Sequence, residues 1–416
     1  MKHVAVIGSG IAGLAAAYFL SQRHRVTVYE KADRLGGHTH TVTVDDESGP
    51  VSLDLGFLVH NDRTYPNLVR LFDELGIATI ETDMSFAVAC PVSGFEYSSR
   101  GLRGFFADRR QLTSPAHLRL LTEIVRFNRE APRVLTLDAA DTTWTLGEFL
   151  RDGRYSDLFV SRYLRPMVSA VWSSSLESID RFPARTLITF MANHGMLSIA
   201  SHPTWRVVRG GSHSYIPALV KPVAAVHTGA AIRWVRRSDD GVRLTFSNRP
   251  PETVDEVVFA CHGDQVLPLL ADPTTIERDV FSGFTTTANE VVLHTDAAAL
   301  PQRAWARASW NYRLDGEDAA APSVTYHLNR LQRLTSQTDY CVTLNPRWLL
   351  PRERVITRVS WQHPRVTPQS VRAQRRWREV SGTRHTHYCG AYWGYGFHED
   401  GLRSAIRVAE SLGVCW

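Results

Sequence analysis

Three glycines near the start of the chain, Gly8, Gly10 and Gly13, have the spacing of a turn that binds the pyrophosphate of a dinucleotide. In such a turn Gly8 makes the sharp bend, Gly10 lets the backbone approach the phosphates, and Gly13 lets a helix lie close to a sheet. That helix would begin with Ile11 and Ala12, and its first N–H groups and its dipole would be directed at the phosphates. The spacing therefore predicts a dinucleotide site.

The elements that must position these glycines are a strand, a helix and a second strand in direct succession. Residues 3–7 (HVAVI) and 25–29 (RVTVY) are short runs typical of buried parallel strands, and an apolar helical pattern separates them. Glu30 ends the second strand, where a carboxylate would accept hydrogen bonds from ribose hydroxyls. Because its charge disfavours a 2′-phosphate, we expect a cofactor other than NADP at this site.

The residues that follow Glu30 separate one class of dinucleotide protein from another. Residues 30–38 (EKADRLGGH) resemble the flavin-containing amine oxidase superfamily, which includes protoporphyrinogen oxidases and phytoene desaturases. The resemblance implies FAD as the cofactor, with Arg34 contacting a phosphate and Gly36–Gly37 letting the backbone approach it. The family pattern usually continues with arginine, so His38 is a departure from it.

Two later segments extend the resemblance. Residues 54–57 (DLGF) resemble the segment that passes beneath the flavin. Residues 388–405 suggest a strand, a glycine-rich loop and a helix to Leu412, with Glu399 and Asp400 in its first turn, where acids favour the helix dipole. The residues expected to bind the cofactor are Gly8, Gly10, Ile11, Ala12, Gly13, Glu30, Lys31, Arg34, Gly36, Gly37, His38, Gly56, Phe57, Trp234, Gly390, Gly396, Phe397, His398 and Glu399.

If both chain ends build one cofactor site, the domain that contains it is discontinuous. We expect an α/β fold, α+β overall, in which residues 1–84, 205–274 and 376–416 form a Rossmann-like FAD-binding domain. Residues 85–204 and 275–375 would form a substrate domain with a mixed sheet and helices.

Several apolar runs supply the strands of these two domains. Residues 205–211, 231–235, 242–246 and 255–261 are expected to complete the FAD-binding domain, and the resemblance implies an adenine contact near Ile232–Trp234. Alternating runs are expected to form the mixed sheet of the substrate domain; they are residues 290–294, 323–327 and 355–359.

The chemistry would be hydride transfer to flavin, with the protein orienting the substrate and excluding water. Amine oxidases of the resembled superfamily commonly place a lysine near the flavin, but this chain has no lysine after Lys221. The corresponding strand, residues 291–296, would bring His294 near the ring. We leave open whether His294 acts in acid–base chemistry or flavin tuning or makes only structural hydrogen bonds; His327 and Tyr326 are weaker candidates.

The substrate is indicated only by resemblance. Residues 390–405 (GAYWGYGFHEDGLRSA) resemble a bacterial group of predicted NAD/FAD-binding proteins, whose genes often lie beside those of cyclopropane-fatty-acid synthase-like methyltransferases. This implies an FAD-dependent oxidoreductase that acts on an apolar, fatty-acyl substrate. An amine or amino-acid oxidase, a redox-neutral double-bond isomerase and a non-catalytic FAD-binding partner are the alternatives.

Other partners are limited by composition. The spacing of His38, His40 and His60 matches no standard ligand set, so we expect no metal. The surroundings of Cys389 do not match a flavin-attachment motif, which favours non-covalent FAD. The net charge is +5 and only three of the 47 basic residues are lysines, but no nucleic-acid motif is present.

The cysteines and the length of the apolar runs indicate where the protein is located. Five scattered cysteines fit reduced thiols, and no apolar run has the length of a membrane span, so we expect a cytoplasmic protein. Residues 118–127 form an amphipathic helical pattern between arginines, which leaves a peripheral membrane contact open, although packing in the domain core is the commoner explanation. The oligomeric state is left open.

Overall fold

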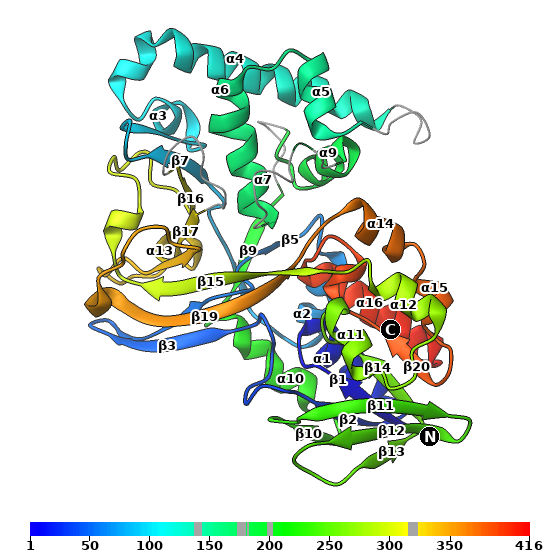
Figure 1. The fold of residues 1–416 in the computed structure, drawn as a ribbon. Helices are drawn as coiled ribbons and strands as arrows, with labels where there is room; N and C mark the ends of the chain where they lie inside the picture. Colours follow the sequence, from blue (N-terminus) through cyan, green and yellow to red (C-terminus); the bar gives the residue numbers. More distant parts are fainter. Residues whose placement is uncertain (137–143, 173–179, 181–182, 198–202, 315–322) are drawn as a thin grey trace.

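A five-stranded parallel sheet lies in the lower part of the molecule in the computed structural model (Figure 1). The structure describes residues 1–136, 144–172, 180, 183–197, 203–314 and 323–416. The sheet order is β10-β2-β1-β14-β20, and every neighbouring pair is parallel. Its strands are β1 (His3–Ile7), β2 (Arg25–Tyr29), β10 (Ala225–His227), β14 (Glu256–Phe259) and β20 (Thr386–Tyr388). The predicted β-α-β unit at the start of the chain is confirmed.

The helix of this unit is buried on nearly all sides. Helix α1 (Ile11–Leu20) packs between the sheet and helix α16 (His398–Ser411), so its small apolar residues face protein in most directions. Helices α2 (Pro66–Glu74) and α10 (Ile216–Val220) complete this core. The first and last segments of the chain therefore share one hydrophobic core, as Figure 1 shows.

Three of the runs expected to complete the FAD-binding domain form strands outside the parallel sheet. Strand β9 (Trp205–Val208) pairs with β5 (His60–Asn61) and β6 (Thr79–Glu81), while β11 (Ile232–Ser238), β12 (Gly241–Phe246) and β13 (Glu252–Val254) form an antiparallel sheet. Side chains of β11 alternate between exposed and buried, which suits a sheet with one solvated face and not a sheet covered on both faces. The edge strand of the parallel sheet is instead β10. It was not expected from the sequence because three residues are too few to show a strand pattern.

A seven-stranded mixed sheet forms the middle of the molecule. Its order is β19-β15-β18-β17-β16-β7-β8, with β16 and β7 parallel and the other pairs antiparallel. The three alternating runs expected here are confirmed as parts of β15, β17 and β19. The strands are β7 (Phe86–Cys90), β8 (Phe95–Ser98), β15 (Thr286–His294), β16 (Trp310–Arg313), β17 (Ser323–His327), β18 (Cys341–Leu344) and β19 (Val355–Pro364).

Helices lie over one end of this sheet, at the top of Figure 1. Leu120 and Phe127 of α4 pack in the same apolar cluster as Tyr312 and Val324 of the sheet, which places the amphipathic stretch 118–127 largely in domain core. The helices of this layer are α3 (Gly101–Phe105), α4 (Pro115–Glu130), α5 (Leu146–Asp152), α6 (Asp157–Phe159), α7 (Arg165–Trp172) and α9 (Ala184–Asn193). Among the described residues, no helix is long and apolar enough to cross a membrane.

The shorter elements connect these layers. A two-stranded ribbon carries the chain from the first sheet toward the second, and small helices lie beside the C-terminal strand and beside β17 (Figure 1). They are β3 (Thr41–Asp46), β4 (Gly49–Asp54), α11 (Val266–Leu269), α12 (Thr275–Phe281), α13 (Leu328–Leu331), α14 (Pro368–Gln374) and α15 (Trp377–Val380).

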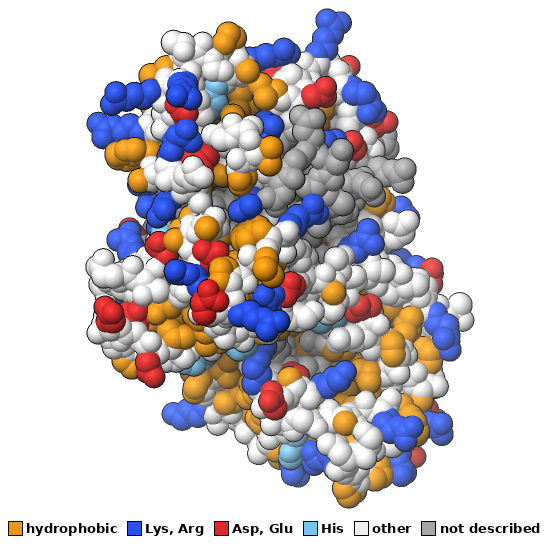
Figure 2. Space-filling model, turned by 60° about the vertical axis from the view of Figure 1, so that its left-hand side comes forward, with side chains coloured by type: hydrophobic (Ala, Val, Ile, Leu, Met, Phe, Trp, Pro, Cys, Tyr) orange, Lys and Arg blue, Asp and Glu red, His pale blue; other side chains and the backbone are white. Residues whose placement is uncertain are grey.

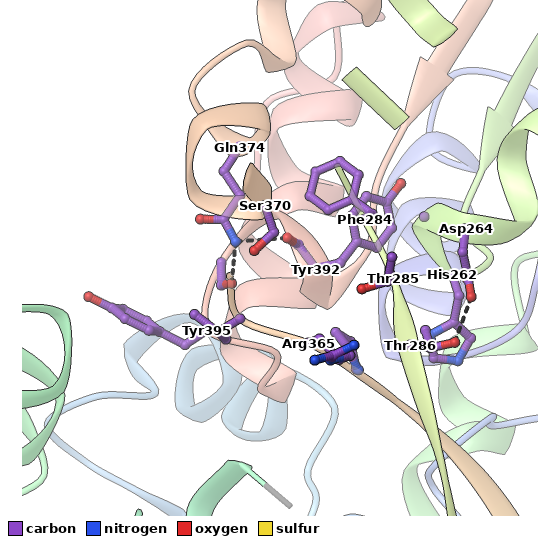
Figure 3. A pocket seen from close by; sticks show the side chains of 14 residues that line it. His262, Asp264, Phe284, Thr285, Thr286, Arg365, Ser370, Gln374, Tyr392 and Tyr395 are labelled. Atoms are coloured by element: carbon purple, nitrogen blue, oxygen red, sulfur yellow. Dashed lines mark hydrogen bonds between the residues drawn. The ribbon is translucent and has the colours of Figure 1, made fainter. Parts of the chain in front are cut away.

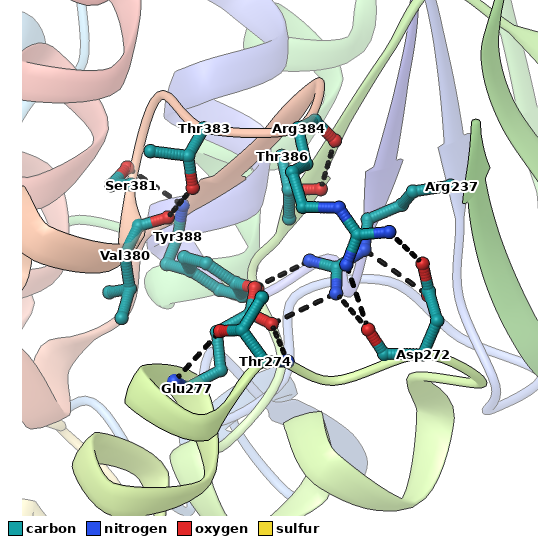
Figure 4. Close-up of polar contacts among 10 residues, drawn as sticks. All are labelled: Arg237, Asp272, Thr274, Glu277, Val380, Ser381, Thr383, Arg384, Thr386 and Tyr388. Carbon is teal, nitrogen blue, oxygen red and sulfur yellow. Dashed lines mark hydrogen bonds and ion pairs between the residues drawn. The ribbon is translucent and has the colours of Figure 1, made fainter. Parts of the chain in front are cut away.

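A buried ion pair ties the antiparallel sheet to the C-terminal strand (Figure 4). Arg237 of β11 donates to both carboxylate oxygens of Glu277 in α12, at 2.5 and 2.9 Å, and Tyr388 of β20 donates to the same carboxylate at 2.6 Å. Burial alone would raise the pKa of Glu277, but the hydrogen bonds from Arg237 and Tyr388 outweigh it and lower the pKa to about 2. The pair fixes three segments that lie far apart in the sequence.

Candidate cofactor site

The carboxyl ends of four neighbouring strands meet at one edge of the parallel sheet. Gly8 follows β1, Glu30 follows β2, His262 lies just after β14, and Gly390 lies just after β20. Ligands of open parallel sheets bind outside the carboxyl ends of the strands. The fold therefore gathers residues from both ends of the chain where such a ligand would lie.

The glycine turn leaves space at one position and none at the others. A Cβ at Gly13 would lie 2.0 Å from the carbonyl oxygen of Gly8, which itself has φ +106°, whereas a Cβ at Gly10 would meet nothing within 4 Å. Helix α1 begins beside this space with Ile11 and Ala12 buried and without a side-chain cap. A buried, uncapped helix start facing open space fits a bound phosphate group.

The carboxylate of Glu30 closes one side of the turn. It accepts hydrogen bonds from the N–H and hydroxyl of Ser9, at 2.9 and 2.6 Å, and from the N–H of Ala32 at 2.8 Å. The N–H of Ala230 donates to the carbonyl of Glu30, so the segment before β11 lies alongside. Lys31 points to the exterior of the protein.

The loop that follows folds back over the glycine turn. A Cβ at Gly37 would lie 3.1 Å from the Cα of Gly10, and Gly36, with φ +103°, donates its N–H to the carbonyl of Ser9. Arg34 donates to the carbonyl of Gly37 at 2.9 Å and lies over the ring of Trp361. The structure thus brings together Gly10, Gly36 and Gly37, and places the Arg34 guanidinium at the same loop.

Asp54 holds the next predicted segment in place. Its buried carboxylate accepts from the hydroxyl of Thr41 at 2.5 Å and from the N–H and hydroxyl of Ser212, each at 2.8 Å. Just beyond it, a Cβ at Gly56 would lie 2.1 Å from the carbonyl oxygen of His38. The Gly56 backbone therefore passes directly against the loop after Gly37, with no room for a side chain.

The ring of Phe57 stacks on the ring of His398 at the start of α16, with centroids 3.7 Å apart. His398 Nε2 lies 3.1 Å from the hydroxyl oxygens of both Thr39 and Tyr215. Burial lowers the pKa of His398 to about 3, so the imidazole is neutral at physiological pH. These groups join the two halves of the site predicted from the sequence.

The C-terminal loop lies against the glycine turn. A Cβ at Gly401 would lie 3.0 Å from the side chain of Ile11, and Gly396, with φ +98°, would point a Cβ into open space. Asp400 accepts from the N–H groups of Tyr395 and Phe397, at 3.0 and 3.1 Å, and so shapes this loop. Gly396 is therefore a second place, after Gly10, where the missing side chain leaves room.

The side chain of Glu399 contacts the start of α2. Its carboxylate accepts from the backbone N–H groups of Asn67 and Leu68 and from the Asn67 side chain, at the first turn of α2. The structure therefore engages this side chain in helix capping. The ring of Phe397, by contrast, lies 5.4 Å from Phe190 of α9 and faces the helical layer.

A cluster of partly buried aromatic rings beside the loop was not found from the sequence. The rings of Trp361, His363 and His262 lie 4.7, 5.3 and 5.7 Å from the ring of His38. Within the described part of the chain, His38 Nε2 and Trp361 Nε1 are buried without a hydrogen-bond partner. Buried polar atoms normally have partners, so these two atoms fit a polar ligand.

The signal that could have found these rings was weak. His262 follows a buried strand, a position that often faces a ligand, but His363 and Trp361 lie in an ordinary alternating run. Burial lowers the pKa of His38, His262 and His363, so these rings are neutral. No group of histidine, cysteine and acidic side chains that could hold a metal ion occurs among the described residues.

A small pocket borders this cluster, at the junction of the two sheets (Figure 3). Its walls include His262, Phe284 and Tyr392, and the Phe284 and Tyr392 rings pack edge to face. Gln374 donates to the carbonyl oxygens of Tyr392 and Gly394, at 2.9 and 2.7 Å, and holds the C-terminal loop against α14. The pocket thus joins the carboxyl end of β14 to the start of β15.

The structure does not bring His294 to this place. His294 ends β15, about 26 Å along the strand from Thr286, whose hydroxyl donates to Asp264 near the pocket. Its Nε2 lies 2.7 Å from the hydroxyl of Thr343, and its Nδ1 accepts from the N–H of Asp296. Both ring nitrogens of this buried side chain are therefore occupied by the protein.

Trp234 is likewise set apart from the glycine loops. Its side chain, on β11, is 39% exposed and packs under the guanidinium of Arg233. Only the backbone just before β11 lies beside Glu30. An adenine contact at this strand would therefore come from the backbone and not from the indole.

Comparison with known proteins supplies a family. The model of the family described as flavin containing amine oxidoreductase matches residues 11–319. Coproporphyrinogen III oxidase of Mycobacterium leprae is 25% identical over 288 residues, which are 64% of this chain and 60% of that protein. L-amino-acid oxidase of Bungarus fasciatus is 47% identical over 53 residues, 12% of this chain and 10% of that protein. This chain thus matches less than two thirds of the length of either relative.

Solved structures share the whole architecture. The CLA-producing fatty acid isomerase from P. acnes has a TM-score of 0.71, with 17% identity and 98% of each chain covered. A putrescine oxidase triple mutant has a TM-score of 0.70, with 16% identity, and covers 99% of this chain and 98% of its own. At these identities the likeness shows the fold alone, and it confirms the fold class expected from the sequence.

Proposed function

Because the chain belongs to the family of flavin-containing amine oxidoreductases, we propose that it uses FAD to oxidise an apolar substrate, a fatty-acyl lipid. When bound, FAD supplies a two-electron acceptor for a hydride. The protein groups would bind the cofactor, orient the substrate and keep water away. The single observation that carries the cofactor is the open space at Gly10, beside a buried and uncapped helix start.

The residues at the glycine turn fit such a cofactor. The α1 N–H groups and the Arg34 guanidinium would meet the phosphates, and Glu30 would accept from ribose. The unpartnered His38 Nε2 would supply one more polar contact. The thiol of Cys389 is buried, and burial raises its pKa, which supports dissociable FAD because a covalent bond would need an accessible thiolate.

The apolar substrate is supported by a group of aromatic rings beyond Phe397. The rings of Phe190, His194 and Trp205 continue from Phe397, with Phe190 and His194 stacked at 3.9 Å and His194 and Trp205 at 6.0 Å. Aromatic walls favour apolar ligands. The carboxylates of Asp54, Glu399 and Asp400 accept hydrogen bonds from protein groups, which makes them weaker sites for a cationic amine than unpaired carboxylates would be.

The fatty-acyl class is the more specific part of the proposal. It is supported by the likeness in fold to the fatty acid isomerase, together with the gene-neighbour habit of the resembled bacterial group. Lipid mass spectrometry of cells with and without the gene tests it directly. The expected result is a changed acyl-chain profile, and an identical profile would contradict the acyl substrate.

The cofactor is tested independently of the substrate. The purified protein should show the absorbance bands of oxidised flavin, and the colour should be released on denaturation because we expect no covalent bond. A protein that remains colourless after addition of FAD would overturn the cofactor assignment. Anaerobic addition of an acyl substrate should then bleach the bands, whereas product formation without net bleaching would indicate a double-bond isomerase.

An amine or amino-acid oxidase is the second candidate. It is supported by the family description and by the shared fold with putrescine oxidase. It requires peroxide release when the flavin-loaded protein meets a panel of amines and amino acids. If no compound of that panel gives peroxide while flavin is bound, this candidate is excluded and the acyl substrate is retained.

A further inference from the structure

Four large apolar side chains stand exposed at one end of the molecule. They belong to Val92 in the turn between β7 and β8, Leu102 in α3, Leu112 in the 3-10 helix η1 (Arg109–Thr113) and Trp305, with exposed fractions of 83%, 72%, 55% and 49%. Scattered single exposed residues are normal, but neighbouring ones on a rigid frame indicate an interaction surface. Two arginines, Arg303 and Arg100, hold these four segments together.

Arg303 connects the segments that carry these side chains. It donates to the carbonyl of Gly94 at 3.2 Å in the β7–β8 turn, to Glu96 at 3.2 Å in β8, and to Asp108 at 2.6 Å, which caps η1. Trp305 lies two residues further along the same loop. Val92, Leu112 and Trp305 are thus held on one frame.

Arg100 joins the fourth segment to this frame. It donates to the carbonyls of Ala304 and Arg307, at 3.3 and 3.1 Å, on either side of Trp305. The guanidinium groups of Arg100 and Arg103 lie 5.5 and 5.4 Å from the Trp305 ring. Leu102 of α3 lies between these two arginines in the chain, so its segment lies beside the loop that carries Trp305.

The charge around these side chains is strongly one-sided. Residues 97–122 contain the arginines Arg100, Arg103, Arg109, Arg110 and Arg119 and a single acid, Asp108. That acid and the buried Glu96 are already paired with Arg303. Arg103, Arg109 and Arg110 remain exposed. Figure 2 shows basic and hydrophobic side chains interspersed over the upper end of the molecule.

We propose that Val92, Leu102, Leu112 and Trp305, with Arg103, Arg109 and Arg110, form a docking surface for a membrane that contains anionic phospholipids. Guanidinium groups bind phosphate oxygens through paired N–H donors, and tryptophan favours the membrane–water boundary. The apolar side chains project from turns and short helices, so their tips can enter the acyl boundary while the arginines remain at the headgroups.

The proposal does not depend on the reaction catalysed, because the docking surface shares no residue with the cofactor site. The test is sedimentation of the flavin-loaded protein with vesicles of phosphatidylglycerol and phosphatidylcholine, or of phosphatidylcholine alone. We expect binding to the mixed vesicles, weakened by added salt and much weaker on phosphatidylcholine alone.

Two variants test the charged and apolar halves of the docking surface separately. Replacement of Arg103, Arg109 and Arg110 by glutamine should weaken binding to the mixed vesicles about a hundredfold. The variant Leu102→Ser/Trp305→Ser should also lower binding at least about tenfold, because apolar area no longer leaves water. The matched control replaces three exposed arginines of another surface, Arg372, Arg375 and Arg378, by glutamine and should bind as the parent does.

Two outcomes would overturn the proposal. One is equal loss of binding in the charge variant and in its matched control, which would indicate only a net-charge effect. The other is unchanged vesicle binding in Leu102→Ser/Trp305→Ser together with loss of a concentration-dependent dimer in ultracentrifugation, which would make this surface an interface between copies of the chain. Unchanged thermal melting and flavin content in each variant establish that folding is intact.

Discussion

The rings of Phe57 and His398 lie parallel within 16°, with their centroids 3.7 Å apart, although 340 residues separate them in the chain. Phe57 follows the Asp54 anchor, and His398 begins the helix that packs on α1. Their contact closes the junction between the first and last segments of the protein.

The glycines of the first turn should separate cofactor binding from folding. Gly10→Val adds a side chain into open space, so we expect normal thermal unfolding of the apoprotein but at least about tenfold weaker FAD binding in a fluorescence titration. Gly13→Ala places its Cβ against the carbonyl of Gly8 and should destabilise the fold by about 1–3 kcal/mol. Full FAD affinity in Gly10→Val would contradict the site.

Glu30 should contribute to affinity through the ribose. In Glu30→Ala the carboxylate that accepts from Ser9 and Ala32 is lost, and we expect FAD to bind about tenfold to a hundredfold more weakly. Riboflavin, which lacks the adenosine ribose, should bind the variant and the parent equally. A parallel loss for riboflavin would mean that the variant has only disordered the turn.

Buried histidines should make the fold sensitive to acid. Burial lowers the pKa of His60, His294 and His363 to about 4 and that of His398 to about 3. Below about pH 6.5 the unfolded chain binds protons that the folded chain does not, so the free energy of unfolding should fall from about pH 6.5 toward pH 4. Urea unfolding at several pH values measures this slope.

A single substitution identifies the source of that slope. His363→Gln removes one group that is neutral in the fold, so the slope should decrease by up to about 1.4 kcal/mol per pH unit. His213→Gln, at an exposed position, is the control for replacing a histidine without removing a buried ring. Equal effects of the two substitutions would contradict the assignment to burial.

The Arg237–Glu277 pair should be costly to break on one side. Glu277→Gln removes the more buried of the two carboxylates that pair with the Arg237 guanidinium and leaves only Asp272, so we expect a loss of about 3–5 kcal/mol in urea unfolding. The double variant Arg237→Met/Glu277→Leu should lose less than the two single variants added together. Because the pKa of Glu277 is lowered to about 2, the contribution of the pair should disappear as the pH falls from about 4.5 toward 2.

His294 has two possible roles, one in acid–base chemistry or flavin tuning and one in structural hydrogen bonding. Its contacts with Thr343 and Asp296 favour the structural role, so His294→Gln should lower stability by about 1–3 kcal/mol with little change in the rate of flavin reduction by substrate. A general acid or base contributes about a hundredfold or more. A rate loss of that size with normal stability would instead place His294 in the chemistry.

The amino-acid sequence determined the local parts of the site and the family. The β-branched runs and glycine spacing of residues 3–30 define a β-α-β unit, because each requirement acts between residues close in the chain. The same is true of Glu399 and Asp400 in the first turn of α16. The flavin family inferred from these segments is confirmed by the family model, whereas the substrate and the catalytic residues stay predictions.

Only the tertiary structure decided which distant residues meet. The strand pattern showed that Leu293 and His294 lie on opposite faces of β15. It did not show which face packs against Leu55, and in the structure that is the face of Leu293. In the same way, the grouping of His38 with His262 depends on how two strands end at one sheet edge. Local spacing sets which residues share a face, whereas the packing of one layer on another sets what that face contacts.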